Sequence, residues 1–329
     1  MKRLTTVIVI AMFSPCILLL AGERAYKWIL TISGEDTKQV FKADDGISGI
    51  CLNDANGEIY VFHGDKKLVR IFDLNGVMQH KFSLRLKKDY GRFSSFTVGP
   101  DGNCYMVADR IMKARGDEKE TSTEILAFDY RGQLSGTLNL DDPPDGMKVD
   151  VDKIKVTPAG DLCVIDGSAA RVVFYDMNGK YKSETSKKKI DVKEPETTGW
   201  FTDVAFGKDG EIFVLSKMLA KVFKFDKNGS LVKKFGKKGG AKGAFSQPCA
   251  IDVDPGGNVH VLDLMRWAVV VFNSNGKWLY DWGAPGKKDG EIYYPRLLAI
   301  DSSGHVYISD MPRRVQVFLK NDEEKVDDK

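Results

Sequence analysis

The stretch FSQPCAIDVDPGGNVHVLDLMRWAVVVFNSNGKWLYDWG, residues 245–283, contains one complete structural unit. An alternating apolar segment leads to a polar turn at Gly257, and a second segment ends at Asp263. After a short basic loop, a third segment leads to a second turn at Gly276, and a fourth follows. Glycine suits such turns because it adopts positive φ without steric cost. The stretch therefore predicts four antiparallel strands joined by short connections.

The same unit recurs along the whole chain. The glycine of the first turn is found at Gly57, Gly102, Gly160, Gly210, Gly257 and Gly304, at spacings of 45, 58, 50, 47 and 47 residues. The glycine of the second turn follows 19 residues later in four units and 30 later in the second unit. The second unit therefore contains an insertion, and we expect residues 111–123, which are charged and lack apolar periodicity, to form a mobile loop.

Six four-stranded units of this length predict an all-β protein, a six-bladed β-propeller. The sixth unit lacks its outer strand, because residues 315–320 are followed only by the charged tail 321–329. AYKWILTISG, residues 25–34, precedes the first unit and resembles the outer strand at residues 276–283. We expect this N-terminal strand to complete the last blade and close the ring, with Trp28 on its apolar face. The predicted propeller spans residues 26–320.

Residues 1–22 are typical of a targeting segment. Lys2 and Arg3 precede an apolar run from Leu4 to Gly22 without a charge, which indicates a signal peptide or an uncleaved membrane anchor. Leu20 makes a poor cleavage site, and a buried helix of the fold is the alternative interpretation. We therefore expect an exported protein that is periplasmic, extracellular or anchored facing outside the cytoplasm.

Two units carry a resemblance to a known family. Residues 245–283 and 293–318 resemble NHL repeats, with a proline entry, a strand ending in aspartate, a basic residue and an apolar-aromatic strand. The resemblance extends over residues 26–320 but is weaker in the first four units, where His63 and Ser216 replace the strand-end aspartate. It implies a six-bladed propeller closed by an N-terminal strand. It implies no single function, because the family includes protein binders, RNA binders, sensors and a few lyases.

Loop lengths predict where a binding site would lie. The glycine turns are nearly constant and would lie on one face, here called the turn face. The connections between second and third strands and between blades vary, and would lie on the opposite, variable-loop face, where binding is expected. The candidate binding residues at the channel mouth on that face are Arg92, Trp200, Gln247, Tyr294 and Arg296, joined by Arg266, Trp267 and Arg313 from the inner loops.

Aromatic and arginine side chains of this kind suit a protein, peptide or envelope glycan as partner. A structural alternative applies to some basic residues in the loops. Arg171, Arg266 and Arg314 each follow a strand-end aspartate, at Asp166, Asp263 and Asp310, and could pair with it as part of the repeat.

Composition restricts the classes of function. The 329 residues carry a formal net charge of +3, so we expect no nucleic-acid partner, and we expect a monomer. No Walker loop, GxSxG, HExxH or CxxC motif is present. The turns NDANG, DPGG and DSSG resemble calcium loops but recur as ordinary β-turns, so we predict no metal or cofactor, while calcium or zinc in the channel stays open. Cys51, Cys104, Cys163 and Cys249 are expected to be buried thiols.

Two functions follow from this pattern. The favoured hypothesis is a non-catalytic binding or scaffold propeller outside the cytoplasm, and no catalytic residue is assigned. The alternative is a metal-dependent propeller enzyme, a lyase or lactone hydrolase with its site in the central channel. The alternative requires channel acids such as Asp150, Asp152 and Asp203 to converge.

Overall fold

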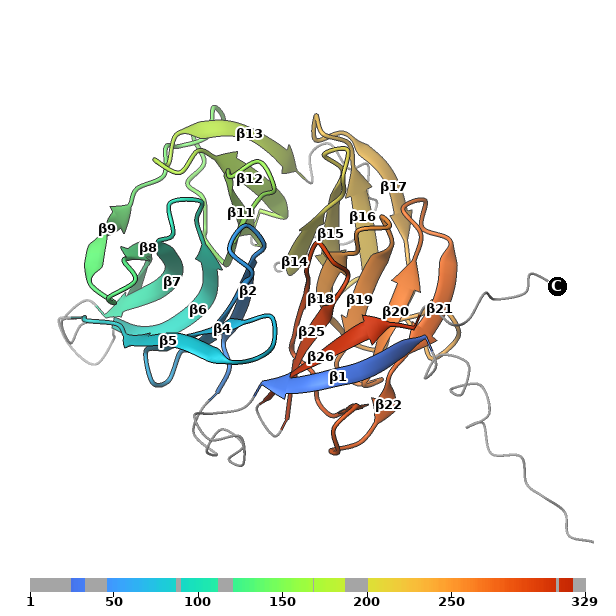
Figure 1. Ribbon diagram of the computed structural model, residues 1–329. Coiled ribbons are helices and arrows are strands. Elements are labelled where there is room, and N and C mark those ends of the chain that lie inside the picture. Colours follow the sequence, from blue (N-terminus) through green and yellow to red (C-terminus); the bar gives the residue numbers. More distant parts are fainter. Residues whose placement is uncertain are drawn as a thin grey trace, which may run out of the picture.

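The computed structural model describes residues 25–32, 46–86, 90–111, 121–167, 169–186, 201–311 and 314–321. The leader, Trp200, Arg313 and the C-terminal tail after residue 321 lie outside these ranges. Six antiparallel four-stranded sheets form a ring, which is a six-bladed β-propeller as predicted (Figure 1).

In each of the first three blades, the strands follow the chain from the innermost to the outermost. Blade 1 consists of β2 (Gly49–Asn53), β3 (Glu58–His63), β4 (Leu68–Asp73) and β5 (Met78–Ser83). Blade 2 consists of β6 (Tyr90–Val98), β7 (Cys104–Ile111), β8 (Thr121–Phe128) and β9 (Leu134–Leu138). Blade 3 consists of β10 (Lys153–Val156), β11 (Leu162–Asp166), β12 (Arg171–Tyr175) and β13 (Tyr181–Ser186).

The remaining blades follow the same order. Blade 4 consists of β14 (Asp203–Phe206), β15 (Ile212–Ser216), β16 (Lys221–Phe225) and β17 (Leu231–Phe235). Blade 5 consists of β18 (Pro248–Val253), β19 (Val259–Asp263), β20 (Ala268–Phe272) and β21 (Trp278–Trp282). Blade 6 consists of β24 (Leu297–Ile300), β25 (Val306–Asp310), β26 (Arg314–Lys320) and β1 (Tyr26–Ile32). A small parallel pair, β22 (Ala284–Pro285) and β23 (Glu291–Ile292), lies in the connection from blade 5 to blade 6.

The N-terminal strand closes the ring, as the sequence predicted. Strand β1 pairs with β26 from Tyr26 opposite Lys320 to Ile32 opposite Val315, and the two lie side by side in Figure 1. The expected apolar anchor is wrong, because Trp28 is 40% exposed and its Nε1 donates to Thr31. Tyr26 and Ile32 are the buried residues of this strand instead. A bulge between Trp28 and Leu30 shifts the register and so changes which side chains face the core.

The hydrophobic core lies between neighbouring blades. The second and third strands of a sheet are buried on both faces, because each face packs against a neighbouring blade. Strands such as β11, β15 and β20 therefore consist mostly of apolar residues. The recurring phenylalanines that the repeat predicted as core are all buried, at Phe72, Phe128, Phe225 and Phe272. The ring is therefore a series of sheet-on-sheet interfaces around a central axis.

The insertion in blade 2 lengthens two strands. Ile111 pairs with Thr121, so β7 takes up the first residue, and β8 the last three, of the segment that the sequence assigned to a loop. Glu124 stabilises this extension, because it accepts hydrogen bonds from Arg110 at 3.0 Å and from the Tyr90 hydroxyl at 2.8 Å. The expected loop boundaries are therefore wrong at both ends, and the remaining residues 112–120 lie outside the described ranges.

No helix in the described part of the chain is long and apolar enough to span a membrane. The targeting segment at residues 1–22 lies outside that part, and it stays a prediction.

Candidate functional site

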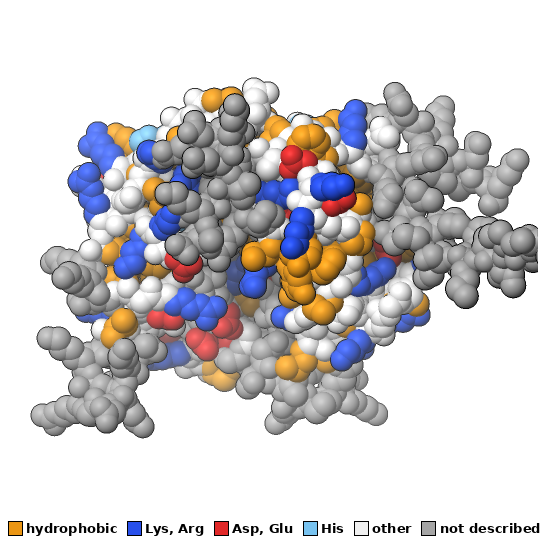
Figure 2. Space-filling model, turned by 90° about the horizontal axis from the view of Figure 1, so that it is seen from below, with side chains coloured by type: hydrophobic (Ala, Val, Ile, Leu, Met, Phe, Trp, Pro, Cys, Tyr) orange, Lys and Arg blue, Asp and Glu red, His pale blue; other side chains and the backbone are white. Residues whose placement is uncertain are grey.

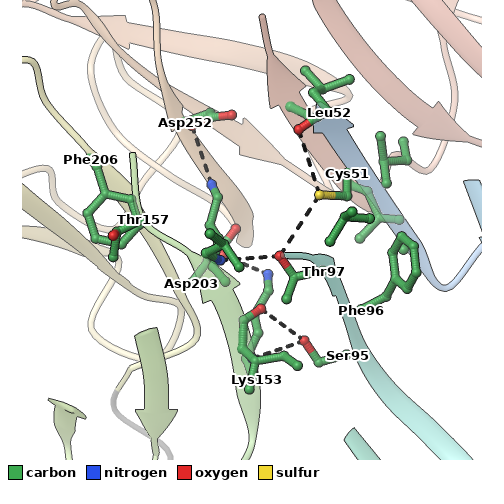
Figure 3. A pocket seen from close by; sticks show the side chains of 18 of the residues that line it. Cys51, Leu52, Ser95, Phe96, Thr97, Lys153, Thr157, Asp203, Phe206 and Asp252 are labelled. Carbon is green, nitrogen blue, oxygen red and sulfur yellow. Dashed lines mark hydrogen bonds and ion pairs between the residues drawn. The ribbon is translucent and has the colours of Figure 1, made fainter. Parts of the chain in front are cut away.

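A central channel of about 1580 Å³ is lined by residues of all six inner strands. Figure 3 shows part of this lining. Its described lining is acidic although the whole chain carries a formal charge of +3. Four basic side chains line it, and nine aspartates outnumber them: Asp54, Asp101, Asp109, Asp150, Asp152, Asp203, Asp252, Asp254 and Asp301. The basic residues are Arg92, Lys153, Lys155 and Lys208. Such a channel favours neutral or cationic molecules over free anions.

Four positions of each inner strand are equivalent around the ring. We number them 1 to 4, with position 4 opposite the second residue after the turn glycine, as Val156 lies opposite Leu162, which follows Gly160. Position 1 is occupied by Gly49, Ser95, Lys153, Asp203, Ala250 and Leu297 in blades 1 to 6. Position 3 is occupied by Cys51, Thr97, Lys155, Ala205, Asp252 and Ala299. Positions 2 and 4 are apolar in every blade.

Side chains at positions 1 and 3 bind the inner strand of the next blade. Ser95 at position 1 accepts from the amide of Ile154 at 3.0 Å, and Asp203 accepts from that of Ile251 at 3.0 Å. At position 3, Thr97 accepts from Val156 at 3.2 Å and Asp252 from Ile300 at 2.9 Å. In each case the acceptor satisfies a main-chain amide that its own sheet leaves free.

Strand β10 departs from this arrangement, because it carries lysines at both positions. The Lys153 Nζ lies 2.6 Å from Asp203 Oδ1, and the Lys155 Nζ lies 3.4 Å from Asp252 Oδ1. The Lys155 ammonium also donates to the Val204 carbonyl at 3.2 Å. Two lysines from blade 3 therefore reach carboxylates of blades 4 and 5. Figure 3 shows Lys153 and the carboxylates of Asp203 and Asp252.

The channel raises the pKa of three groups, which keeps a lysine charged and makes two carboxyl groups easier to protonate. Burial alone would lower the pKa of Lys155, but the carboxylates of Asp252 and Asp203 outweigh it and raise the pKa, so the ammonium stays charged. The loss of solvent around Asp152, together with the charges of Asp150 and Asp166, raises the pKa of that carboxyl. The pKa of the Asp54 carboxyl is raised in the same way, by loss of solvent and by the charge of Asp301.

The three channel acids named from the sequence all line this cavity. Asp150 and Asp152 are near enough to interact electrostatically, and Asp152 accepts from the Gly167 amide at 2.7 Å. Asp203 is taken by Lys153 and by two main-chain amides. The acids thus share the channel, with one of them held in an ion pair.

The described residues do not fit a metal ion. No three histidine, cysteine, aspartate or glutamate side chains among them come together as metal ligands. The aspartates of the turns are used by the turns themselves, since Asp301 accepts from the amides of Ser303 and His305, and Asp254 from that of Asn258. A metal-dependent reaction therefore has no ligand set in the described part of the channel.

The structure distributes the candidate binding residues that it describes over several places and brings two of them, Tyr294 and Trp267, into contact. Arg92 lines the channel, and Gln247 lines a second cavity of about 580 Å³ between blades 4 and 5. Tyr294 is 40% exposed and packs against Trp267, with ring centroids 5.2 Å apart. Arg296 is exposed beside it at the entry to β24. The binding role of these residues, and of Trp200 and Arg313, stays a prediction.

The alternative structural role of the loop arginines applies to two of the three. The Nε of Arg171 donates to Asp166 at 2.9 Å, and the Nε of Arg314 donates to Asp310 at 3.0 Å. Arg266 instead pairs with Asp281 at 2.6 Å, while Asp263 accepts main-chain amides of its own loop. All three arginines have structural partners.

The four described cysteines are free thiols, two of them fully buried and two partly buried. Burial raises the pKa of the Cys249 thiol to about 12. A protonated thiol is a poor nucleophile, so these cysteines contribute packing to the structure.

The second cavity opens on the variable-loop face. It is lined by Thr202, Lys217, Met218, Ala220, Lys238, Ser246, Gln247 and Met265. Met218 and Met265 are each more than half exposed. Strand β22 belongs to this face and lies at the bottom of Figure 1. Figure 2, which is seen from below that view, shows hydrophobic side chains gathered beside lysine and arginine side chains.

Lys153, Lys155 and Asp252 were not among the functional candidates predicted from the sequence. Their signal was a charged residue at every second position of a short inner strand, as in Lys153-Ile154-Lys155. Alternation of this kind places charge on one face of a strand, which the propeller directs towards the channel and the next blade. The pairing between blades could not be read from spacing.

No family model matches this chain, and no curated protein matches it. The NHL resemblance is therefore not confirmed. Solved structures share the fold: a streptogramin B lyase with 10% identity and a TM-score of 0.59 aligns over 90% of this chain and 98% of its own. A virginiamycin B lyase from Staphylococcus aureus has 12% identity over 89% and 99%, with a TM-score of 0.58. A gluconolactonase from Xanthomonas campestris has 14% identity over 84% and 87%, with a TM-score of 0.54. At these identities the likeness shows the fold alone, a six-bladed β-propeller.

Proposed function

We propose that this protein is an enzyme of the lyase or lactone-hydrolase class, which acts on a small neutral molecule in its central channel. The observation that carries the proposal is the pairing of opposite functions in one cavity. Asp152, with its raised pKa, is suited to proton transfer, and Lys155 keeps its charge through two carboxylates. A purely structural channel would need neither.

Each group has a definite role in such a reaction. In an elimination, the Asp152 carboxylate takes the proton next to a carbonyl, and the ammonium group of Lys155 stabilises the enolate. Asp152 then returns the same proton to the departing oxygen. In a lactone hydrolysis, Asp152 takes the proton from water as its oxygen adds to the carbonyl, and gives it to the ring oxygen as that leaves.

The charge of the channel supports a neutral substrate. The described acids exceed the bases, so an anionic substrate would be repelled while hydroxyl groups would find carboxylate acceptors. The titles of the lyases and of the gluconolactonase with this fold support the class of reaction. They transfer no residue, and because the described residues offer no metal ligand set, no step is assigned to a metal.

The test is turnover by the purified protein. A panel of neutral lactones and cyclic ester peptides is assayed with and without a chelator. We expect hydrolysis or ring opening that withstands the chelator, and Asp152→Asn should lower kcat/KM by about 10² or more. The matched control, Lys227→Ala on the exposed turn face, should change nothing. Absence of turnover, or full activity of Asp152→Asn, would contradict the proposal.

A second function, binding of a protein or peptide, is favoured by the cavity between blades 4 and 5. Exposed methionines adapt to varied apolar partners, and Lys217 and Lys238 beside them would attract acidic groups. The double variant Met218→Glu and Met265→Glu should then lose a partner captured from envelope extract. Lys208→Ala with Lys227→Ala on the turn face should keep it. Equal capture by both variants would argue against this surface.

A further inference from the structure

The register of β14 determines which of its amides face the channel. The Gly207 amide donates to the Glu211 carbonyl at 2.8 Å, so Gly207 and Glu211 form a hydrogen-bonded pair across the turn. Hydrogen-bonded pairs alternate along an antiparallel ladder. Ala205 therefore bonds to β15, and the amides of Val204 and Phe206 point away from their own sheet.

At two other junctions the side chain at position 3 accepts from the amide at position 4 of the next blade. Thr97 takes that of Val156, and Asp252 takes that of Ile300. At the junction between blades 3 and 4 the corresponding side chain is Lys155, and an ammonium cannot accept a hydrogen bond. It donates to the neighbouring Val204 carbonyl instead, at 3.2 Å.

The Phe206 amide consequently has no acceptor among the described side chains. The Val204 amide is taken by Asp203 Oδ1 at 2.9 Å, so it does not share this condition. Along the edge of β14 the Val204 carbonyl and the Phe206 amide are separated only by Ala205. The Lys155 ammonium, which donates to the Val204 carbonyl, therefore lies beside the Phe206 amide.

We infer that the Lys155 ammonium and the Phe206 amide form a two-donor pocket for the carbonyl oxygen of a neutral ligand. Two converging donors of this kind stabilise an oxygen on which negative charge develops. Among the described inner strands, β10 is the one that carries a cation at position 3, so the pocket exists at this junction. The acidic lining opposes free anions and so favours a carbonyl over a carboxylate. The catalytic use of the pocket rests on the proposed function, whereas its binding does not.

The test observes the Phe206 amide directly. Labelling alanine with ¹³C at the carbonyl and phenylalanine with ¹⁵N selects Ala-Phe pairs, which occur in this sequence at Phe128, Phe206 and Phe245. Three amide signals result, and two of them are internal controls. The probes are γ-butyrolactone, tetrahydrofuran as a ring of the same size without the carbonyl, and sodium acetate.

We expect γ-butyrolactone to shift the Phe206 signal with saturation and to leave the other two unchanged. Tetrahydrofuran should have no effect, and acetate should bind more weakly than the lactone. Lys155→Thr introduces at this position of blade 3 the residue that blade 2 has there, Thr97. Its hydroxyl can accept a hydrogen bond from the Phe206 amide. This variant should keep its melting temperature and weaken the lactone response about tenfold or more.

Lys153→Ser is the matched control, since it removes a channel cation at position 1 and introduces the residue found in blade 2. It should keep the response within about twofold. The inference is overturned if the lactone leaves Phe206 unchanged, if Lys155→Thr responds as the unaltered protein does, or if acetate binds more tightly than the lactone. Turnover without a Phe206 shift would reject this pocket alone, and a shift without turnover would reject the proposed enzyme alone.

Discussion

His63 is a buried histidine that must stay neutral in the folded protein. Its Nε2 lies 2.8 Å from Nη1 of Arg70, and burial, followed by the charge of Arg70, lowers its pKa to about 3. In the unfolded chain the imidazole takes up a proton near its ordinary value of about 6.5. The unfolded state therefore binds more protons than the folded state below that pH. Its contribution to stability is present above pH 6.5 and is lost as the pH falls towards 3.

The expected slope from His63 is up to about 1.4 kcal/mol per pH unit between these limits. His63→Asn removes the titrating group, so the free energy of unfolding of this variant should decline less steeply with acid. Denaturant titrations at intervals from pH 7 to pH 3.5 measure the difference between the two proteins. Asp310, whose pKa is raised to about 6, acts in the opposite sense and is common to both. If the free energy of unfolding fell equally steeply with acid in both proteins, His63 would not be the group responsible.

Residue chemistry was predicted well where a repeat imposed it and poorly where two blades met. Phe72 and its equivalents were recognised as core because they recur at blade spacing. The pairs Lys153–Asp203 and Lys155–Asp252 join residues about 50 and 97 positions apart, and no local pattern indicates them. A contact of this kind depends on the angle between blades, which the sequence of one repeat does not contain.

Strand β1 closes the propeller through two side chains at its ends. Tyr26 is 6% exposed and stacks on Trp282 with ring centroids 4.3 Å apart, and Ile32 is 1% exposed. Tyr26→Ala should reduce the free energy of unfolding by about 3 kcal/mol or more, and Ile32→Ala by about 2–5 kcal/mol. Trp28→Ala, in a half-exposed position of the same strand, is the control and should cost about 1 kcal/mol or less. Chemical denaturation gives all three values, and a larger loss at Trp28 than at Tyr26 would contradict the assigned anchors.

Strands β7 and β8 end opposite each other at Ile111 and Thr121, so residues 112–120 connect a formed hairpin. Replacing these nine residues by Asn-Gly supplies the two-residue turn that suits right-twisted strands. A shorter connection costs less closure entropy, so the melting temperature should stay equal or rise slightly. Differential scanning calorimetry measures this. Unfolding of the shortened protein would show that the segment contributes packing of its own.

Elements were predicted to the extent that glycine marks them. The turn glycines predicted the number of strands and of blades, and the missing outer strand of the sixth unit predicted closure by the N-terminal strand. The extension of β7 and β8 was hidden because its stabilising contacts are polar, between Arg110, Tyr90 and Glu124, so they carry no apolar periodicity. Bulges such as the one in β1 were hidden as well, and they decide which side chain reaches the core.

On the scale of the whole molecule, the ring is not uniform. Inner strands β6 and β10 are joined by the neutral acceptors Ser95 and Thr97, whereas β10 and β14 are joined by one ion pair and by a lysine that donates to a main-chain carbonyl. Among the described inner strands, the main chains of β10 and β14 are in less contact than those of any other neighbouring pair. Apolar packing still connects these blades farther out, through Cys163, Val172 and Val204. The weakness is therefore confined to the wall of the channel.

This asymmetry predicts a salt-sensitive opening at one place in the ring. Partly exposed ion pairs are weakened by salt, whereas hydroxyl-to-amide bonds are nearly unaffected. Native-state hydrogen exchange followed by mass spectrometry should show faster exchange in peptides containing β14 than in those containing β6, with the difference growing between 0.05 M and 0.5 M sodium chloride. Lys153→Ser combined with Lys155→Thr restores neutral acceptors at both positions, so exchange in β14 should slow and lose its dependence on salt. Equal protection of β14 and β6 at both salt concentrations would mean that the ion pairs hold the channel wall as firmly as the neutral bonds do, and that the ring opens, if at all, somewhere else.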